Sequence, residues 1–226
     1  MLPVRVIKPH SFSIDDIIIE KGAVNRVAEI VGRYDAKKVF LLADRNTYEA
    51  AGKQICENLL AAGFAISKHV FGSGELEPDE HTVGSAVMGF DPACDLILAV
   101  GSGVINDVGK ILANVSGKPY IIFGTAPSMD GYAFATSSMS VGGLKVSLPS
   151  KQVNVIMTDT EILAKAPTVL LQAGIGDMLA KYVAICEWKI AQTFSRCIMT
   201  AKIMRQISSD LRIRYSSEAC SCLTNE

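Results

Sequence analysis

Short apolar segments alternate with amphipathic segments along most of this 226-residue chain. The apolar segments have the length and composition of buried strands and lie at 38–44, 65–72, 94–103, 118–128 and 153–159. Segments with helical features separate the first four of them, at 47–63, 77–90 and 104–117. Gly63 is expected to be a helix C-cap, and Pro78 with its acidic neighbours is typical of a helix N-terminus. Because the strands are largely apolar, the sequence predicts a parallel sheet with helices on both faces.

The pattern changes after about residue 130. Residues 137–150 are expected to form a hairpin that turns at Gly142 and Gly143, and from Ile162 onward the chain is expected to be helical. The predicted fold class is therefore α/β. A Rossmann-like parallel-sheet domain in residues 1–160 is followed by an incomplete all-helical domain in residues 161–226.

Composition excludes several classes of function. The net charge is −1, which gives no electrostatic basis for a nucleic-acid partner or for an anionic membrane surface. No uninterrupted apolar run approaches the ~20 residues of a membrane span, and residues 1–16 lack the apolar core of a signal peptide. A cytoplasmic protein without a membrane partner is expected. The six cysteines are scattered and predict reduced thiols: Cys56, Cys94, Cys186, Cys197, Cys220 and Cys222.

Polar loops follow three of the predicted strands. The strand ending in "LLAD" ends at Asp44, "AVGSG" runs into a glycine turn, and "PYIIFG" leads into "TAPSMDGYA". In parallel sheets ligands bind at the carboxyl ends of the strands, and these loops all lie at that edge. Packing alone gives no reason to place hydroxyl groups and one carboxylate directly after a buried strand.

Each loop also has a purely structural interpretation. The turn 101–107 can approach a phosphate at a helix N-terminus, or it can be an ordinary tight turn, since it lacks the G-x-G-x-x-G spacing. Asp44 can accept the hydroxyls of an adenosine ribose, which would favour NAD over NADP, or it can cap a helix. The loop from Thr125 to Asp130 can be a capped turn. Asp177 can be an acidic residue just inside a helix start broken by glycines, paired with Lys181.

Taken in order, the four stretches Asp44, "GSGVINDVGK", "TAPSMDGYA" and "AGIGDMLAKY" resemble the sn-glycerol-1-phosphate dehydrogenase family. That family is part of a wider group with the iron-type alcohol dehydrogenases, glycerol dehydrogenases and dehydroquinate synthases. The resemblance covers residues 15–192, and "TAPSMDG" is its most specific part.

The resemblance implies an NAD- or NADP-dependent oxidoreductase that interconverts sn-glycerol 1-phosphate and dihydroxyacetone phosphate with Zn²⁺ or Ni²⁺. It implies cofactor contacts from Asp44, Gly101, Ser102, Gly103, Val104, Ile105, Asn106, Asp107, Thr125 and Ser128. Asp130 would contact the substrate, and Asp177 would be a metal ligand and a substrate contact, which makes both candidate catalytic residues. The metal would bind the secondary oxygen of the substrate as a Lewis acid. Association into a homo-oligomer is left open.

The sequence departs from the family at several positions. Phe134 stands where the family often has a serine that touches NAD, and the two metal histidines of the family have no counterpart, since His10, His69 and His81 occur in other contexts. From about residue 193 the chain no longer resembles the family, so truncation or a frame change is expected. Three hypotheses follow: an oxidoreductase or its remnant, a nucleotide-binding module without catalysis, and a dehydroquinate synthase-like lyase, which "TAPSMDGY" argues against.

Overall fold

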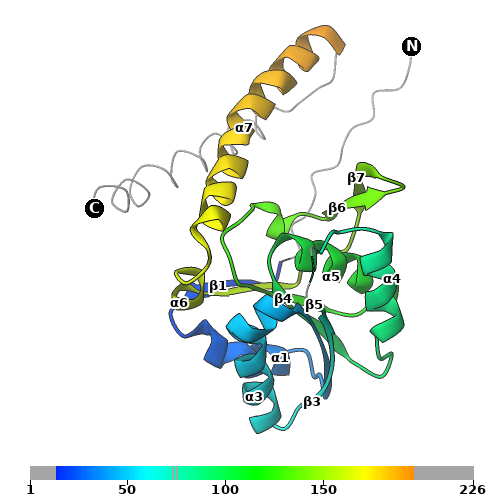
Figure 1. Cartoon of the computed structure of the whole chain (residues 1–226), viewed down its shortest axis with the longest axis vertical. Helices are drawn as coiled ribbons and strands as arrows, with labels where there is room; N and C mark the ends of the chain where they lie inside the picture. Colours follow the sequence, from blue (N-terminus) through cyan, green and yellow to red (C-terminus); the bar gives the residue numbers. More distant parts are fainter. Residues whose placement is uncertain (1–13, 73, 75, 196–226) are drawn as a thin grey trace. The chain divides into compact units, whose positions relative to one another are not determined.

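A six-stranded sheet forms the centre of the computed structural model, which describes residues 14–72, 74 and 76–195. The strands are β1 (Asp16–Glu20), β2 (Lys38–Asp44), β3 (Ala65–Phe71), β4 (Leu96–Gly101), β5 (Tyr120–Gly124) and β8 (Val155–Asp159). Their order across the sheet is β1-β8-β5-β4-β2-β3, and all neighbouring pairs are parallel. The predicted Rossmann-like parallel sheet is confirmed (Figure 1).

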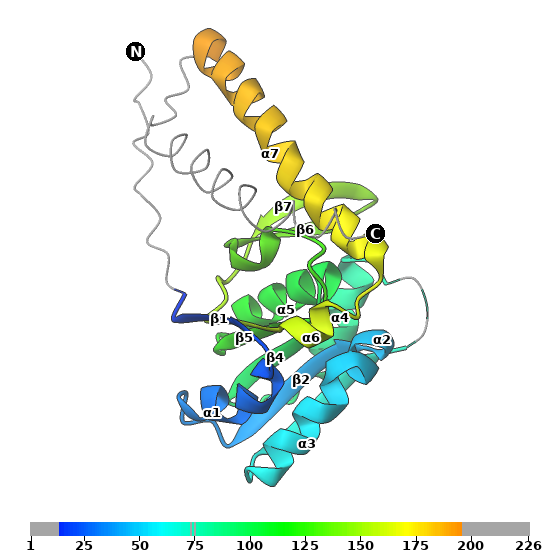
Figure 2. The ribbon, with the colours of Figure 1, turned by 90° about the vertical axis from the view of Figure 1, so that its left-hand side faces the viewer.

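Helices cover both faces of the sheet (Figure 2). The α-helices of the described residues are α1 (Val27–Gly32), α2 (Arg45–Thr47), α3 (Lys53–Ala61), α4 (Glu80–Gly89), α5 (Gly103–Ser116), α6 (Thr160–Leu163) and α7 (Thr168–Ser195). One core cluster joins α1 and α3 to strand residues such as Leu41 and Leu98, and a second joins α4 and α5 to the alternate residues Leu42 and Ala99. Both faces of β2 and β4 are therefore buried, which explains why these strands are apolar throughout.

The antiparallel hairpin is confirmed as well. It contains β6 (Thr136–Val141) and β7 (Leu144–Pro149), with Gly142 and Gly143 at the turn. Both glycines have positive φ, at 57° and 79°, and such a two-residue turn requires this of both positions.

The helix predicted at 47–63 begins earlier and is not uniform. It starts at Arg45 with α2, passes through the π-helical segment η2 (Tyr48–Gly52) and continues as α3. At its end Gly63 has φ +89°, which fits the expected C-cap.

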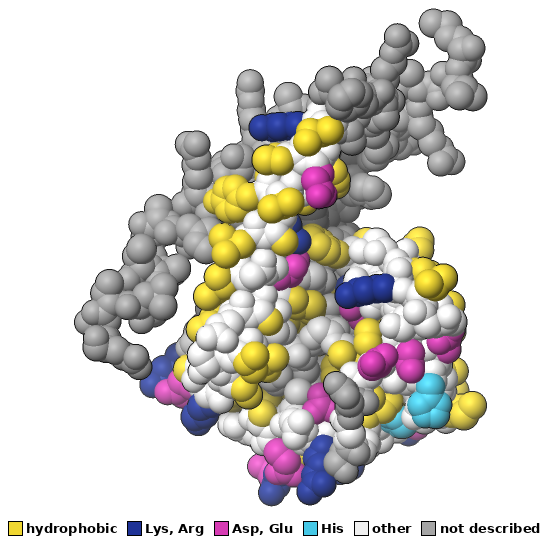
Figure 3. Space-filling model, turned by 45° about the horizontal axis from the view of Figure 1, so that its top comes forward, with side chains coloured by type: hydrophobic (Ala, Val, Ile, Leu, Met, Phe, Trp, Pro, Cys, Tyr) yellow, Lys and Arg dark blue, Asp and Glu magenta, His cyan; other side chains and the backbone are white. Residues whose placement is uncertain are grey.

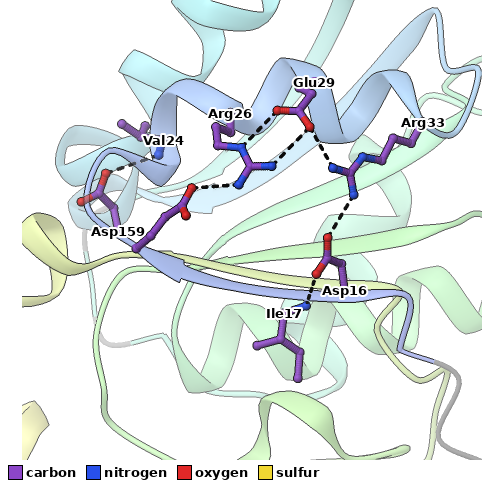
Figure 4. A network of polar contacts seen from close by, with 8 residues as sticks. Asp16, Ile17, Val24, Arg26, Glu29, Arg33 and Asp159 are labelled. Atoms are coloured by element: carbon purple, nitrogen blue, oxygen red, sulfur yellow. Dashed lines mark hydrogen bonds and ion pairs between the residues drawn. The ribbon is translucent and has the colours of Figure 1, made fainter.

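The strand β1 and the helices that follow it were not predicted. A polar network holds β1 against η1 (Ala23–Arg26) and α1 (Figure 4). The Arg33 guanidinium lies 3.0 Å from Asp16 Oδ2 and 2.8 Å from Glu29 Oε1, while Arg26 Nη1 lies 2.9 Å from Glu20 Oε1. These pairs are solvent-exposed, so each contributes little to stability. Their role is to join the edge strand to the helix that covers it.

Contacts within the chain divide it into two units, Met1–Leu171 and Gln172–Glu226. The described part of the second unit is helical and belongs to α7. The prediction that Gly174 and Gly176 break this helix is wrong, because α7 is continuous from Thr168 and Asp177 lies in its third turn. A helical glycine costs only about 1 kcal/mol relative to alanine, which does not end a long helix. The domain boundary near residue 160 stays a prediction.

Exposed hydrophobic side chains are frequent on α7, including Val169, Leu179 and Trp188, and Figure 3 shows such side chains over much of the described surface. The segment Thr168–Ile190 is long and apolar enough to cross a membrane by length and composition, which counting uninterrupted apolar runs did not reveal. Those two properties do not separate a membrane span from a helix that packs through one face against other helices. The segment is therefore weak evidence for a membrane.

Candidate functional site

The three predicted loops lie at one edge of the sheet. In the strand order β4 stands between β2 and β5, so the carboxyl ends of these strands place Asp44, Gly101 and Gly124 side by side. After β2 the chain moves to the face covered by α3, and after β4 it moves to the face covered by α5. The crevice between two such strands is the usual ligand site of a doubly wound sheet.

Asp44 caps the helix that follows it. Its Oδ1 accepts a hydrogen bond from the Thr47 backbone N–H at 2.9 Å, and the Thr47 hydroxyl accepts one from the Asp44 N–H at 3.1 Å. The capping interpretation is thus confirmed. The cap uses Oδ1 and leaves Oδ2 without a hydrogen bond from the described residues, so the predicted ribose contact is compatible with the cap and stays a prediction.

The glycine turn leads into a helix without a side-chain cap. Ser102 is the N-cap of the 14-residue helix α5 and makes no capping hydrogen bond through its side chain. The first helical hydrogen bond runs from the Asn106 N–H to the Ser102 carbonyl at 2.9 Å. The backbone N–H groups before Asn106 therefore have no carbonyl acceptor within the helix. Such a terminus attracts anions. At Gly101 a Cβ would lie 2.5 Å from Ile105 Cβ, which explains why the tight turn needs a glycine there.

A cavity of about 260 Å³ opens between these two elements. Asp44, Arg45 and Asn46 line it from the β2 side, Ser102, Val104 and Ile105 line it from α5, and Gly72, Gly74 and Leu76 complete it. Its size suits part of a dinucleotide. The structure therefore brings two of the three predicted loops to one cavity.

Asn106 and Asp107 follow the cavity-lining residues on α5 but do not line the cavity themselves. Asn106 is completely buried, and its Oδ1 accepts a hydrogen bond from the Tyr120 hydroxyl at 3.2 Å. The Asp107 carboxylate lies 3.0 Å from Lys110 Nζ. Burial raises the pKa of the Asp107 carboxyl, and Lys110 opposes this shift. The structure gives both residues an internal role, and their predicted cofactor contacts stay predictions.

The loop after β5 lies on the other side of the start of α5. The Thr125 N–H donates to the Gly101 carbonyl at 3.1 Å, and a Cβ on Gly103 would come within 3.7 Å of Met129 Sδ. Thr125 is buried, whereas Ser128 and Asp130 are partly exposed. This third loop thus adjoins the glycine turn, but it does not line the cavity, and the cofactor and substrate roles of its residues stay predictions.

A metal site is not present among the residues that the structure describes, which contain no group of three or more His, Cys, Asp or Glu side chains placed to hold an ion. Asp177, the predicted metal ligand, belongs to the second unit, and its Oδ1 lies 3.8 Å from Lys181 Nζ, as their spacing on one helix face predicted. His69 lies in β3, where Nε2 contacts the Ser85 hydroxyl at 3.2 Å, and burial lowers its pKa. His10 lies outside the described residues.

A larger cavity of about 360 Å³ lies between α4, α5 and the β6–β7 hairpin. Val83, Val87, Met139 and other apolar side chains line it, with Glu80 at its edge. A phosphate-bearing ligand would lose its hydration there without gaining partners. This cavity is therefore not the candidate site.

Sequence reasoning missed two residues near the site. Lys110 is 1% exposed and lies two turns into α5, where helical spacing gave it no special role. Thr158, at the carboxyl end of β8, is 7% exposed, and its Oγ1 is a buried polar atom without a hydrogen-bond partner. Thr158 stands near the end of an apolar strand, and Thr125 stands directly after one. This position is the only sequence feature that could have indicated Thr158 as a residue near the site.

The six-stranded parallel sheet with helices on both faces defines a doubly wound α/β class of protein. Residues 18–167 match the iron-containing alcohol dehydrogenase family, and the chain belongs to this family. It is 32% identical to the glycerol-1-phosphate dehydrogenase [NAD(P)+] of Bacillus velezensis over 182 residues, which cover 79% of the chain and 46% of that relative. It is 34% identical to the protein of the same name from Methanosphaerula palustris over 223 residues. That match covers 90% of the chain and 58% of the relative.

Among solved structures, glycerol dehydrogenase from Schizosaccharomyces pombe is similar with a TM-score of 0.69 and 26% identity. That similarity covers 78% of this chain and 45% of the yeast protein. The chain spans about half the length of the curated glycerol-1-phosphate dehydrogenases that it matches. The resemblance to the glycerol-1-phosphate dehydrogenase group is thereby confirmed, and the activity of those proteins is a separate question for this chain.

Proposed function

We propose that this chain provides the dinucleotide-binding part of an NAD(P)-dependent oxidoreductase that interconverts sn-glycerol 1-phosphate and dihydroxyacetone phosphate. One observation carries the proposal. The cavity between Asp44 and the uncapped start of α5 lies at the carboxyl edge of the sheet, and the loop that contains Asp130 adjoins the same glycine turn through the bond from the Thr125 N–H to the Gly101 carbonyl. A cytoplasmic location, a small-molecule substrate and a homo-oligomeric state belong to the same proposal.

The described residues fit a dinucleotide. The first-turn N–H groups of α5 would hold the pyrophosphate, because the helix dipole and the unpaired donors favour negative charge. Asp44 would hold the adenosine ribose through the oxygen that its cap does not use, and its charge would disfavour the 2′-phosphate of NADP. Thr125 and Ser128 would hold the cofactor from the neighbouring loop.

The chemistry that the cofactor supplies when bound is the acceptance or donation of a hydride. The part played by this chain is to bind and orient the two reactants. Asp130 would accept hydrogen bonds from substrate hydroxyls, and the loop 125–131 would keep the substrate next to the cofactor. Because both reactants are held in a fixed geometry, the reaction no longer depends on their meeting in solution. This effect of proximity and orientation accounts for a large part of the rate enhancement that such a site provides.

The metal that the family implies does not fit the described residues. Tight zinc sites use at least three protein ligands, and here Asp177 is the one candidate that the resemblance assigns. No step of the proposed reaction is therefore routed through a metal. Whether Zn²⁺ or Ni²⁺ acts with this chain is tested below by adding each ion.

The test uses the full chain. NAD⁺ and NADP⁺ are titrated first, and oxidation of NADH by dihydroxyacetone phosphate is then followed at the NADH absorbance band, with and without Zn²⁺ or Ni²⁺. The proposal expects saturable NAD⁺ binding and turnover. The variant Asp130→Asn should lose substrate affinity and keep NAD⁺ affinity, while Asp35→Asn, an exposed position with φ +52° that asparagine tolerates, should change neither. Failure of the unaltered chain to bind either dinucleotide would refute the proposal.

A second candidate function is a nucleotide-binding module without catalysis. The observation that favours it is the contrast between the cavity at Asp44 and Ser102 and the lack of a three-ligand metal cluster among the described residues. Saturable NAD⁺ binding without turnover in the presence of either metal would select this candidate.

A further inference from the structure

A buried ammonium group connects α5 with the end of the loop that contains Asp130. Lys110 projects from α5, and its Nζ donates hydrogen bonds to the carbonyl oxygens of Gly131, at 3.3 Å, and Thr136. The third neighbour of Nζ is Asp107 Oδ1 at 3.0 Å. The three N–H bonds of an ammonium group thus have three acceptors, and all of them are internal to the protein.

Other contacts converge on the same segment. The Gly131 carbonyl also accepts a hydrogen bond from Asn106 Nδ2 at 3.5 Å. The Asp107 carbonyl accepts one from the Ser137 hydroxyl at 3.1 Å. The second turn of α5 therefore holds residues 131–137, whereas its first turn lines the cavity. The same helix therefore both lines the cavity and holds residues 131–137.

The two halves of the loop are anchored in different ways. Its first half is fixed by β5 and by the bond from the Thr125 N–H to the Gly101 carbonyl. Its second half, directly after Asp130, is joined to α5 through Lys110 and Asn106. Other contacts of this half include the Tyr132 hydroxyl to the Ala126 carbonyl at 2.8 Å, within the loop, and Gln152 Nε2 to the Ala133 carbonyl at 3.0 Å, from the segment after β7.

We infer that Lys110 is a positioning residue for the substrate: its ammonium group holds Gly131 and Thr136 against α5 and thereby fixes Asp130 relative to the cofactor cavity. The inference rests on the proposed function for the identity of the substrate. Lys110 touches neither substrate nor cofactor in this account and acts through the loop.

The burial of Lys110 supports a specific role. A charged group inside a protein is costly unless it is paired and hydrogen-bonded, and a methionine of similar length would fill the same space at lower cost. Burial lowers the pKa of the Lys110 ammonium, and the Asp107 carboxylate counteracts part of that shift. What the ammonium adds over an apolar side chain is the pair of hydrogen bonds to loop carbonyls.

The experiment compares three variants of the full chain. Lys110→Met removes the ammonium and keeps the volume. Asp107→Asn/Lys110→Met removes both charges, so that no unpaired carboxylate stays buried if the single variant does not fold. Lys151→Met is the matched control, because Lys151 Nζ donates to the carbonyls of Gly117, at 3.1 Å, and Lys118, at 2.6 Å, which precede β5 at the opposite edge of the sheet.

Two measurements are made on each variant. The first is amide hydrogen exchange in peptides covering residues 129–138, with peptides of β2 and β4 as internal references. Exchange in 129–138 should rise about tenfold or more in both Lys110 variants and stay unchanged in the control, since local opening becomes easier where anchoring bonds are lost. The second is the affinity for NAD⁺ and, with NAD⁺ bound, for glycerol 1-phosphate. In Lys110→Met, substrate affinity should fall about tenfold or more with NAD⁺ affinity nearly unchanged, because a displacement of ~1 Å remote from the reacting atoms has effects up to ~100-fold. The double variant is judged by hydrogen exchange alone, because Asp107 is itself a predicted cofactor contact.

Opposite results overturn the inference. Unchanged exchange in 129–138 in both Lys110 variants would show that the ammonium does not hold the loop. An equal rise of exchange in β2 and β4, or an equal loss of NAD⁺ and substrate affinity, would show a general structural role. If the unaltered chain binds neither ligand, the proposed function fails, and the exchange measurement still decides whether Lys110 anchors the loop.

Discussion

The polar groups at the two edges of the sheet differ in how many of them have hydrogen-bond partners within the chain. At the amino edge, Asp95 Oδ2 accepts hydrogen bonds from the backbone N–H groups of Lys37 and Lys38, at 2.8 and 3.0 Å. Asn154 Oδ1 accepts one from the Tyr120 N–H at 3.0 Å, and Lys151 donates to two carbonyls that precede β5. Side chains at this edge therefore satisfy the strand ends from within the chain.

The carboxyl edge leaves more of its polar groups available. Asp44 caps α2, but Ser102 gives α5 no side-chain cap, and Thr158 Oγ1 has no partner among the described residues. Buried polar groups without partners are rare in folded proteins. The difference agrees with a structural role for the amino edge and with the proposed ligand site at the carboxyl edge. Substitutions at the two edges should accordingly separate stability from NAD⁺ affinity.

The largest effect is expected for Gly101→Ala. Its Cβ would lie 2.5 Å from Ile105 Cβ, and the start of α5 would have to shift. We expect a loss of ~1–3 kcal/mol in the free energy of unfolding and at least about tenfold weaker NAD⁺ binding, since donor geometry at the α5 start would change. Urea unfolding and NAD⁺ titration measure the two quantities.

Gly84→Ala is the control for this prediction. A Cβ on Gly84, within α4, meets nothing within 4 Å, so the substitution should raise the free energy of unfolding by ~0.4–1 kcal/mol and leave NAD⁺ binding unchanged. If Gly101→Ala and Gly84→Ala change the free energy of unfolding and NAD⁺ affinity equally, the argument for a close turn at the carboxyl edge fails.

Asn154→Ala tests the amino edge. It leaves the completely buried Tyr120 without a partner for its backbone N–H, which should lower the free energy of unfolding by ~1–3 kcal/mol. NAD⁺ affinity should not change, because the substitution lies at the edge away from the cavity. Denaturant unfolding and titration of the same preparation decide this, and a weaker affinity in the folded variant would contradict the division between the edges.

A pair of Asp44 variants separates capping from ligand binding. Asp44→Asn retains an oxygen that can cap α2 and should keep the stability, whereas Asp44→Ala should lose ~1 kcal/mol. Both variants should weaken NAD⁺ binding. Both should also reduce the difference in affinity between NAD⁺ and NADP⁺, since the negative charge at position 44 is gone. If the asparagine variant keeps the unaltered preference, Asp44 is only a cap.

The smallest effect on stability is expected for Thr158→Val. The unpartnered hydroxyl contributes no hydrogen bond, so the free energy of unfolding should change by less than ~1 kcal/mol, and it should not fall. Ser137→Ala provides the contrast, because the buried Ser137 hydroxyl donates to the Asp107 carbonyl and its loss should cost ~1 kcal/mol. A marked destabilisation by Thr158→Val would show that the hydroxyl has an internal partner.

The arrangement of strands and helices followed from local pattern, with gaps where the pattern is weak. The apolar strands 38–44 and 94–103 predicted β2 and β4, and the glycine pair 142–143 predicted the hairpin turn. Strand β1 was not predicted, since its apolar run is short and lies between acidic residues in the sequence DIIIE, although Ile17 and Ile19 are exposed in the structure. The interruption expected at Gly174 and Gly176 did not occur, because intrinsic propensity is weak compared with the continuity of a long helix.

What the sequence determined by itself is which residues end their strands at the carboxyl edge of the sheet, because strand ends and glycine turns are set by neighbouring residues. Only the tertiary structure decided which of these residues face the cavity. Ser102 and Asp107 stand five positions apart on one turn-and-helix segment, yet the first lines the cavity and the second pairs with Lys110 inside. Helical periodicity sets the direction of each side chain, but what packs against each face of the helix decides whether it is buried. The partners of Lys110, Gly131 and Thr136, lie 21 and 26 residues further along the chain.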